Sequence, residues 1–271
     1  MTTIIRPPSK ISKEIIRSFY YLEFDQTKES NSGIVVDDAC YELLFVKEKN
    51  VNFINSDKEA FRIPPSFTLI NPKSPFKFEF PETFSVFSIK IQPWMNASYV
   101  PTQKGKVINL DTIYPKINEL HQALMDAESI QKKIDRAENF LLGLPIKQTE
   151  ETNLIKNICL LIYERFGNIT VNEIADEYKI YRQKLNQLFK QEVKYTLKVF
   201  IDCVRIRACL TYKFEHPEIS LTEIGHLFGY FDQAHFIRSF KKATGVSPSE
   251  YVNAGGYSLT SAPFQKGNYP F

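Results

Sequence analysis

About one hundred residues at the end of this 271-residue chain contain one helical pattern twice. In each copy an aliphatic residue is followed directly by a very small one, and two apolar residues four positions apart come next. The copies consist of Ile174, Ala175, Leu185 and Phe189, and of Ile224, Gly225, Phe236 and Phe240. Side chains four apart share one face of a helix, so each copy predicts two short helices packed on each other.

The small residue in each copy marks the place where the two helices cross. Ala175 and Gly225 let the helices approach closely, whereas a larger side chain would push them apart. Each copy is therefore interpreted as a helix-turn-helix. Chance recurrence of apolar residues at helical spacing would explain one copy, and the repeat favours the motif.

The face opposite the apolar pair is polar and suited to reading bases. Gln and Asn can form two hydrogen bonds with adenine, Arg can do so with guanine, and an aliphatic chain can touch the thymine methyl group. The candidate base-reading residues are Gln183, Asn186, Gln187, Gln233, His235, Ile237 and Arg238. They predict direct contact with double-stranded DNA.

Basic residues near the same helices are candidates for phosphate contacts. They are Arg182, Lys184, Lys190, Lys194, Lys241 and Lys242. Residues 152–253 contain 14 Lys and Arg against 11 Asp and Glu, and residues 1–151 contain 19 against 20. The small positive excess permits DNA binding, but a solvated helix surface explains it equally well.

A longer helix is expected between the two copies. Apolar residues recur at three and four spacing from Leu197 to Phe214, and Pro217 ends the pattern. Such a helix is about 25 Å long. It could hold two recognition helices near one turn of DNA apart, on one face of a duplex.

The second copy carries a more specific pattern. Its residues run from Gly229 through Tyr230, Asp232, Gln233, His235 and Phe236 to Gly245, Val246, Ser247, Pro248 and Tyr251. Residues 153–252 resemble the AraC/XylS family of bacterial transcription regulators. The resemblance implies that one monomer reads two successive grooves of promoter DNA, with RNA polymerase as a partner and activation as the commoner outcome. Arg205 matches an arginine of the family's connecting helix, where a salt bridge and a phosphate contact are both open.

Three positions depart from the family pattern. Lys179 stands where the family has Gly in the turn, and Tyr181 and Phe231 stand where it has Ser, Thr or Asn capping the recognition helix. A missing cap costs about 1 kcal/mol. Asp232 could cap the second recognition helix one residue later, while nothing equivalent is available for the first. The base register of the first helix stays open.

The first 110 residues show a sequence pattern typical of short strands. Alternating apolar and polar residues, separated by turn residues, favour a barrel or sandwich. The strand candidates are residues 20–23, 41–47, 51–54, 66–70, 76–80 and 87–92. Residues 34–45 and 87–93 resemble the cupin-like sensory domain that precedes many AraC-type DNA-binding domains.

The expected fold is therefore α+β in two domains. Residues 1–110 form a cupin-like β-barrel for sensing, residues 111–143 a helical hairpin, residues 144–152 a linker, residues 153–253 an all-α double helix-turn-helix, and residues 254–271 a mobile tail. The hairpin has an apolar stripe. Family resemblance implies a dimerisation surface there, and packing on the barrel explains the stripe equally well.

Chemistry of other kinds finds little support in the sequence. Residues 1–151 contain a single histidine, His121, so we expect no metal, no cofactor and no enzymatic activity. The four cysteines lack paired spacing and predict buried thiols. Aromatic and aliphatic residues of the barrel, with Trp94 among them, could surround a small apolar effector or simply fill the core.

The sequence also predicts where the protein acts and leaves two competing functions open. The sequence has no apolar run of membrane-spanning length and no signal-peptide pattern at its start, so a place at the bacterial nucleoid in the cytoplasm is expected, without a membrane partner. A module whose helix pairs dock on another protein is the main alternative. A barrel enzyme with a vestigial DNA domain is the third.

Overall fold

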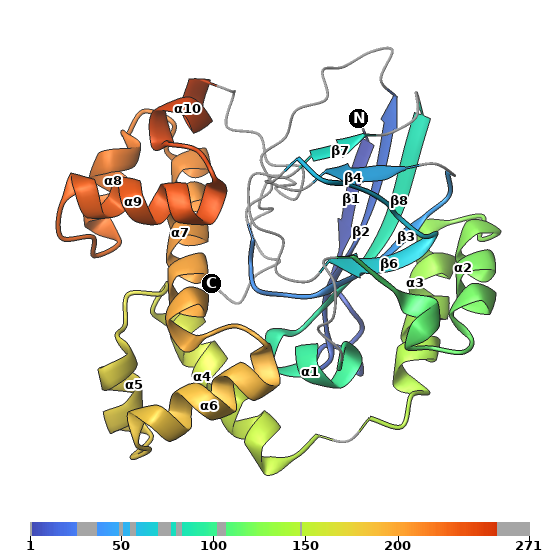
Figure 1. Cartoon of the computed structure of the whole chain (residues 1–271), viewed down its shortest axis with the longest axis horizontal. Helices are drawn as coiled ribbons and strands as arrows, with labels where there is room; N and C mark the ends of the chain where they lie inside the picture. The colour runs from blue at the N-terminus through green and yellow to red at the C-terminus, as the bar shows by residue number, and fades with distance from the viewer. Residues whose placement is uncertain are drawn as a thin grey trace. The chain divides into compact units, whose positions relative to one another are not determined.

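The computed structural model describes residues 2–25, 37–48, 51–54, 58–69, 77–79, 83–101, 107–146 and 148–253 (Figure 1). They fall into two compact units. The first contains most of the chain up to residue 147, and the second contains residues from 148 onward together with the short segment around residues 37–39. The tail, residues 254–271, lies outside the described residues.

The first unit contains two antiparallel sheets. A six-stranded sheet has the order β1-β2-β8-β3-β6-β9, and a three-stranded sheet has the order β5-β4-β7. The strands are β1 Thr2–Arg6, β2 Ile16–Asp25, β3 Glu42–Val46, β4 Asn52–Ile54, β5 Ala60–Arg62, β6 Ser66–Leu69, β7 Lys77–Glu79, β8 Thr83–Ile91 and β9 Val107–Asn109. All pairings described between them are antiparallel.

Every strand candidate from the sequence coincides with a strand, but several bounds differ. Strand β2 begins at Ile16 and β8 begins at Thr83, each earlier than its alternating stretch indicated. The two strands pair with each other over most of their length. Backbone pairing thus extends them beyond their apolar alternation. Strands β1, β5 and β9 were not anticipated, because their short stretches are recognisable only through the strands they pair with.

The two faces of the large sheet are buried differently. Leu22, Leu44 and Val86 contribute to one apolar core, together with residues near the small sheet such as Val51 and Ile63. Neighbouring strand residues alternate between faces. The opposite face therefore carries Phe19, Phe45 and Phe87 among its buried residues.

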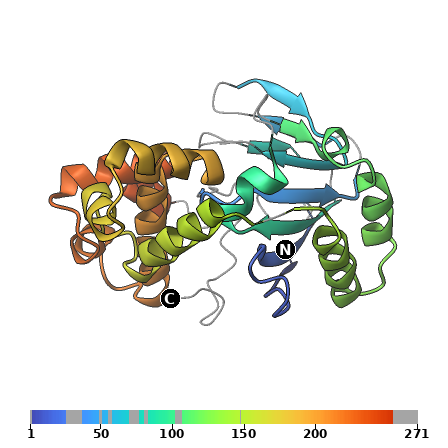
Figure 2. The same cartoon turned by 90° about the horizontal axis from the view of Figure 1, so that it is seen from below.

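A helical hairpin covers this opposite face. Its helices are α2 Ile117–Met125 and α3 Ile130–Leu142, which lie side by side in both views (Figures 1 and 2). His121 joins the hairpin to the sheet, because its Nε2 atom lies 2.8 Å from the carbonyl oxygen of Val46. The stripe residues Ile117, Leu120, Leu124, Ile134, Ala137 and Leu141 are all buried. Packing inside the unit therefore accounts for the stripe.

Short helical segments complete the first unit. They are the 3-10 turns Pro93–Met95 and Leu110–Thr112 and the helix α1 Asn96–Tyr99. The Trp94 indole is buried, and its N–H donates to the carbonyl oxygen of Glu14. This indole is thereby fixed in the core and does not line an open interior.

The second unit is built from helices. They are α4 Glu150–Glu164, α5 Val171–Glu177, α6 Arg182–Val193, α7 Leu197–Glu215, α8 Leu221–Leu227, α9 Gln233–Thr244 and α10 Pro248–Asn253. Helices α5 and α6 form one pair and α8 and α9 the other, with α7 as the long helix expected between them. The α+β prediction is confirmed. No helix in the described part of the chain is long and apolar enough to cross a membrane.

Helix α4 begins earlier than expected. The sequence interpretation began it at Asn153, whereas it starts at Glu150. The side chain of Thr149 accepts a hydrogen bond from the backbone N–H of Thr152 and so caps the helix. Glu150 and Glu151 add negative charge to the first turn, which suits the positive end of the helix dipole.

The crossing of α8 and α9 depends on the absence of a side chain at Gly225. A Cβ atom placed there would lie 2.8 Å from Cγ of Phe236. The ring cannot retreat easily, because Phe236 is buried among Ile224, Tyr230 and Phe240. Ala175 holds the matching place in the first pair, where one methyl group is accommodated.

We predict that Gly225→Val lowers the free energy of unfolding of the helical unit by about 1–3 kcal/mol, the usual cost of overpacking a core. Urea titration followed by circular dichroism at the helical wavelength measures the change. Ala175→Gly is the control, with a cost of about 1 kcal/mol from helix propensity alone. A Gly225→Val protein as stable as the natural chain would contradict the close crossing.

Both helix pairs open with a capping box. The Thr170 hydroxyl accepts from the backbone N–H of Glu173 while the Glu173 carboxylate accepts from Thr170, and Ser220 and Glu223 do the same. Hydrogen bonds from Thr170 and Ser220 hold the pKa of the Glu173 and Glu223 carboxyl groups below the ordinary value of 4.5. The carboxylate form is the one that accepts these hydrogen bonds from Thr170 and Ser220.

A depressed pKa means that this stabilisation is present above pH 4.5 and is lost as the pH falls through the folded-state pKa. We predict that the double variant Glu173→Gln, Glu223→Gln loses less stability between pH 6 and pH 3 than the natural chain does. Gln still fills the capping box but does not titrate. Thermal melts across this pH range measure the difference, and parallel curves for the two proteins would refute the role of the carboxylates.

Candidate functional site

An equivalent backbone hydrogen bond closes the turn in each helix pair. The N–H of Ile180 donates to the carbonyl oxygen of Ala175 at 3.0 Å, and the N–H of Tyr230 donates to that of Gly225 at 3.0 Å. The residue before each donor is left-handed, with φ +53° at Lys179 and φ +78° at Gly229. The first turn thus keeps the glycine-type backbone even though it lacks the glycine.

The two recognition helices start in different registers after this shared turn. Asp232 caps α9, because its Oδ1 atom accepts from the backbone N–H of His235 at 2.6 Å. This confirms the expected later cap. Tyr181 stands at the cap position of α6 and makes no side-chain cap hydrogen bond. The second pair therefore has one residue more between its turn and its helix than the first.

The extra residue fixes which side chains correspond. The buried pair Leu185 and Phe189 occupies the places of Phe236 and Phe240, counted from the helix starts. By the same count Gln187 corresponds to Arg238, and both are exposed. These matched positions give each recognition helix a polar side chain at the same point along its outer face.

The remaining base-reading candidates differ in exposure. Gln183 and Gln233 are exposed, and Asn186, His235 and Ile237 are half-buried. The Asn186 amide nitrogen donates to the carbonyl oxygen of Arg182 at 2.9 Å, and the His235 ring lies 5.3 Å from that of Tyr230. Asn186 is therefore held by its own helix, and the His235 ring packs on the turn that precedes α9.

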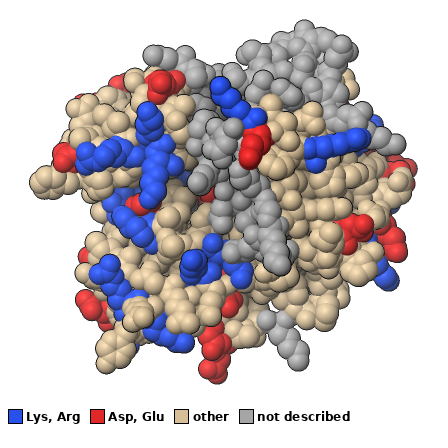
Figure 3. Space-filling model, in the orientation of Figure 1, with Lys and Arg blue, Asp and Glu red and all other residues tan. Residues whose placement is uncertain are grey.

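Basic side chains flank both recognition helices. Figure 3 shows Lys and Arg gathered over the part of the chain that contains α6 and α9. Arg182, Lys184, Lys190, Lys241 and Lys242 are exposed, as a phosphate contact requires. Lys194 is half-buried and left-handed, with φ +67°, and it ends α6 where Gly245 ends α9.

Arg205 lies in the interior of the helical unit. The residue is only 7% exposed. Its Nε donates to the carbonyl oxygen of Gly167 at 2.7 Å, and its guanidinium carbon lies 5.4 Å from the centre of the Tyr230 ring. Burial also raises the pKa of the Tyr230 hydroxyl. Of the two roles considered for Arg205, a phosphate contact is wrong, since a buried guanidinium cannot face DNA. Its role is structural, through a carbonyl and a ring.

The turn after α4 lies against the turn between α8 and α9. Gly167 has φ +70°, and a Cβ atom on it would lie 2.7 Å from the backbone nitrogen of Arg205. A Cβ atom on Gly229 would lie 2.2 Å from Oδ1 of Asn168. The Phe166 and Phe228 rings meet edge to face at 6.2 Å. Sequence reasoning missed this junction, for which Gly167 after a helix was the available signal.

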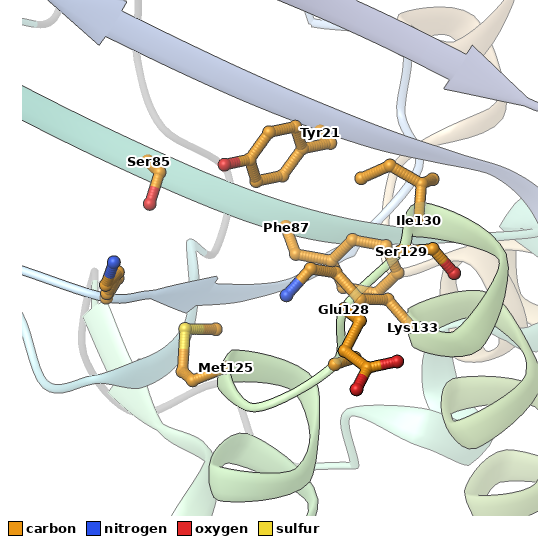
Figure 4. A pocket seen from close by; sticks show the side chains of 10 residues that line it. Tyr21, Ser85, Phe87, Met125, Glu128, Ser129, Ile130 and Lys133 are labelled. Carbon is orange, nitrogen blue, oxygen red and sulfur yellow. The ribbon is translucent and has the colours of Figure 1, made fainter.

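A cavity of about 370 Å³ lies in the first unit, between the sheet and the hairpin (Figure 4). Tyr21 and Phe87 come from the face of the sheet that the hairpin covers, and Lys133 comes from α3. The other lining residues are Lys47, Ser85, Met125, Ala127, Glu128, Ser129 and Ile130. The Lys133 ammonium donates to the carbonyl oxygen of Leu124 at the end of α2. Desolvation, with Arg136 and Lys47 nearby, lowers the pKa of Lys133.

The described residues offer no metal site, and their cysteines are buried. Among the described residues no group of three or more His, Cys, Asp or Glu side chains is arranged to hold a metal ion. Cys40, Cys159, Cys203 and Cys209 are all buried thiols, as expected. Burial raises the pKa of Cys203 and Cys209, so neither is set up as a reactive thiolate.

Comparison with known proteins gives consistent matches for the helical unit. Residues 174–254 match the family model described as a helix-turn-helix domain. The Msm operon regulatory protein of Streptococcus mutans is 28% identical over 113 residues, which are 40% of this chain and 40% of that protein. The uncharacterized HTH-type transcriptional regulator YijO of Escherichia coli is 27% identical over 125 residues, 45% of this chain and 44% of that protein. The chain thus spans less than half the length of these relatives.

The fold has a counterpart among solved structures. ToxT from Vibrio cholerae aligns with a TM-score of 0.50 and 13% identity over 93% of this chain and 98% of that one. At this identity the match shows a shared two-domain fold alone. The paired motif and the sequence matches together show that residues 174–254 form a helix-turn-helix domain of the AraC type.

Proposed function

We propose that this protein is a sequence-specific DNA-binding transcription regulator that reads two successive major grooves with α6 and α9. One observation carries the proposal. Exposed polar side chains, led by Gln187 and Arg238, occupy matching positions on two recognition helices that a single buried helix, α7, holds together.

The roles within the interface follow from exposure and chemistry. Gln183, Gln187, Gln233 and Arg238 reach base edges directly, and Asn186, His235 and Ile237 contribute at closer approach. Arg182, Lys184, Lys190, Lys194, Lys241 and Lys242 bind phosphates and set the register on the duplex without reading sequence.

The cellular setting is part of the proposal. Promoter DNA is the partner, and the resemblance of residues 153–252 to AraC/XylS regulators supports contact with RNA polymerase and a place at the bacterial nucleoid. The residues do not fix activation or repression. We assign sensing to residues 1–110, with the hairpin 111–143 as a further surface for a second copy, and DNA binding to residues 153–253 with the preceding turn of α4.

A protein-docking role for the helix pairs is the competing function. It requires no basic surface, whereas DNA binding gains from one because phosphate contacts release counterions. The exposed lysines at both recognition helices favour DNA. Binding that ignores salt and leaves no imprint on a duplex would favour the docking role instead.

We predict that base-reading and phosphate-binding residues separate in a binding assay. On duplexes selected from a random pool, Gln187→Ala and Arg238→Ala each cost about 1–3 kcal/mol and relax the preference at one base pair. Lys242→Ala weakens all sequences alike and reduces the salt slope by about one. Gel shifts over base substitutions and salt concentrations measure both.

Asn186→Ala is predicted to cost less than Gln187→Ala, because the Asn186 amide is already hydrogen-bonded within α6. Equal losses on selected and random duplexes for Gln187→Ala and Arg238→Ala would count against base reading.

We further propose that a small effector binds the cavity between the sheet and the hairpin. Its volume of about 370 Å³ suits a small molecule. The wall combines the rings of Tyr21 and Phe87 with two basic side chains, Lys47 and Lys133, against the single carboxylate of Glu128. An aromatic ligand that carries an acidic group is therefore favoured. This site lies behind the sheet and replaces the barrel interior as the expected effector site, since the described interior is a packed core.

The charge of the lining gives a paired test of this site. We predict that benzoate raises the melting temperature of the natural protein more than benzamide does, and that Lys133→Met removes the difference. Both probes have the same ring, so only the carboxylate separates them. Equal shifts for the two probes, or an unchanged difference in Lys133→Met, would refute an acidic effector there.

A further inference from the structure

Two solvent-exposed aromatic rings lie at the N-terminal ends of the two recognition helices, α6 and α9. Tyr181 and Phe231 are each 90% exposed, more than any other large apolar side chain recorded among the described residues. The other large apolar side chains recorded as exposed are between 37% and 76% exposed, so these two rings stand apart from the rest. The packing of the helical unit gives no reason for them.

Counted from the turn that precedes each recognition helix, the two rings occupy the same place in the repeat. Each directly follows the residue whose N–H closes the turn, Ile180 in the first pair and Tyr230 in the second. The shared hydrogen bond, 3.0 Å in both, fixes the chain immediately before the ring. The equivalence holds although α6 begins one residue after Tyr181 and α9 two residues after Phe231.

Neither ring serves the helix start. Tyr181 occupies the cap position of α6 without a cap hydrogen bond, and in the second pair Asp232 does the capping. A residue that neither packs nor caps, and that recurs at equivalent points, is best explained by something outside the chain. The repetition favours a partner that presents the same surface twice, as two successive grooves of one duplex do.

The surroundings of each ring also match DNA. Arg182, Gln183 and Lys184 follow Tyr181, and Gln233 and Arg238 lie beyond Phe231 on the exposed side of α9. Helix beginnings attract phosphates. A ring beside them therefore meets the edge of the major groove, where the thymine C5-methyl group is the apolar feature.

We infer that Tyr181 and Phe231 are specificity-determining residues that contact thymine methyl groups, one at the edge of each groove. The inference rests on the proposed DNA binding and adds the base class that is read there. Burial of each ring against a methyl group and deoxyribose removes apolar surface from water in the complex only. Tyr181 can also donate its hydroxyl to a phosphate.

Replacement of thymine by deoxyuridine tests this contact, because it removes the methyl group and leaves base pairing intact. On a selected duplex, each thymine is replaced in turn. The natural full-length chain is expected to lose about fourfold in affinity at one thymine in each half-site, as burial of one methyl-sized group predicts. Phe231→Ser is expected to bind the thymine duplex about tenfold more weakly and to ignore the deoxyuridine in its own half-site.

Matched variants keep the outcome clear. Phe231→Leu and Tyr181→Phe retain an apolar group and are expected to keep the deoxyuridine penalty. Ile11→Ser removes an exposed apolar side chain from the other unit and is expected to change nothing. Tyr181→Ser is expected to behave in the first half-site as Phe231→Ser does in the second. Both rings are exposed, so both variants should keep the natural circular dichroism spectrum and melting temperature.

Three results would overturn the inference while DNA binding stands. The first is a Tyr181→Ser or Phe231→Ser protein that binds as the natural chain does, and the second is either of these variants keeping the deoxyuridine penalty in its own half-site. The third is a set of selected sites with no thymine at either groove edge. Absence of any selected duplex for the natural chain would instead defeat the proposed function itself.

Discussion

The guanidinium of Arg205 joins the two halves of the helical unit, and the presentation of both recognition helices depends on this junction. Its Nε binds the carbonyl oxygen of Gly167 in the turn after α4, and its plane lies over Tyr230 in the turn before α9. Without the arginine a buried carbonyl would lose its partner, at about 1–3 kcal/mol. The close approach of Gly229 to Asn168 adds a second contact between the same turns. In the proposed complex, the two helices that read successive grooves would thereby have a fixed spacing.

The two helix pairs have the same turn geometry but differ at the start of their recognition helices. The same backbone hydrogen bond and left-handed residue close both turns. Asp232 then adds one residue and a cap that the first pair lacks. The outward side chains at matching helix positions nevertheless differ, as Gln187 and Arg238 do, so in the proposed complex the two grooves need not contain the same bases. An internally repeated domain can in this way recognise a site with two different halves.

Much of this arrangement was predictable from the sequence because it is local. Apolar spacing located both helix pairs and α7, the small residues at Ala175 and Gly225 located the crossings, and Asp232 was anticipated as the later cap. Strands β1, β5 and β9 were missed, since their pairing partners lie far away in the sequence. The interior place of Arg205 depends on Gly167 and Tyr230, which no spacing rule connects. The cavity behind the sheet likewise arises from four separated segments.

Hydroxyl-radical footprinting of the full-length chain on a selected duplex tests the central claim most directly. If α7 holds α6 and α9 for successive grooves, one monomer should protect two segments whose centres lie about 10 base pairs apart on one face of the duplex. A single short protected segment, or two segments on opposite faces, would contradict a fixed pair of recognition helices.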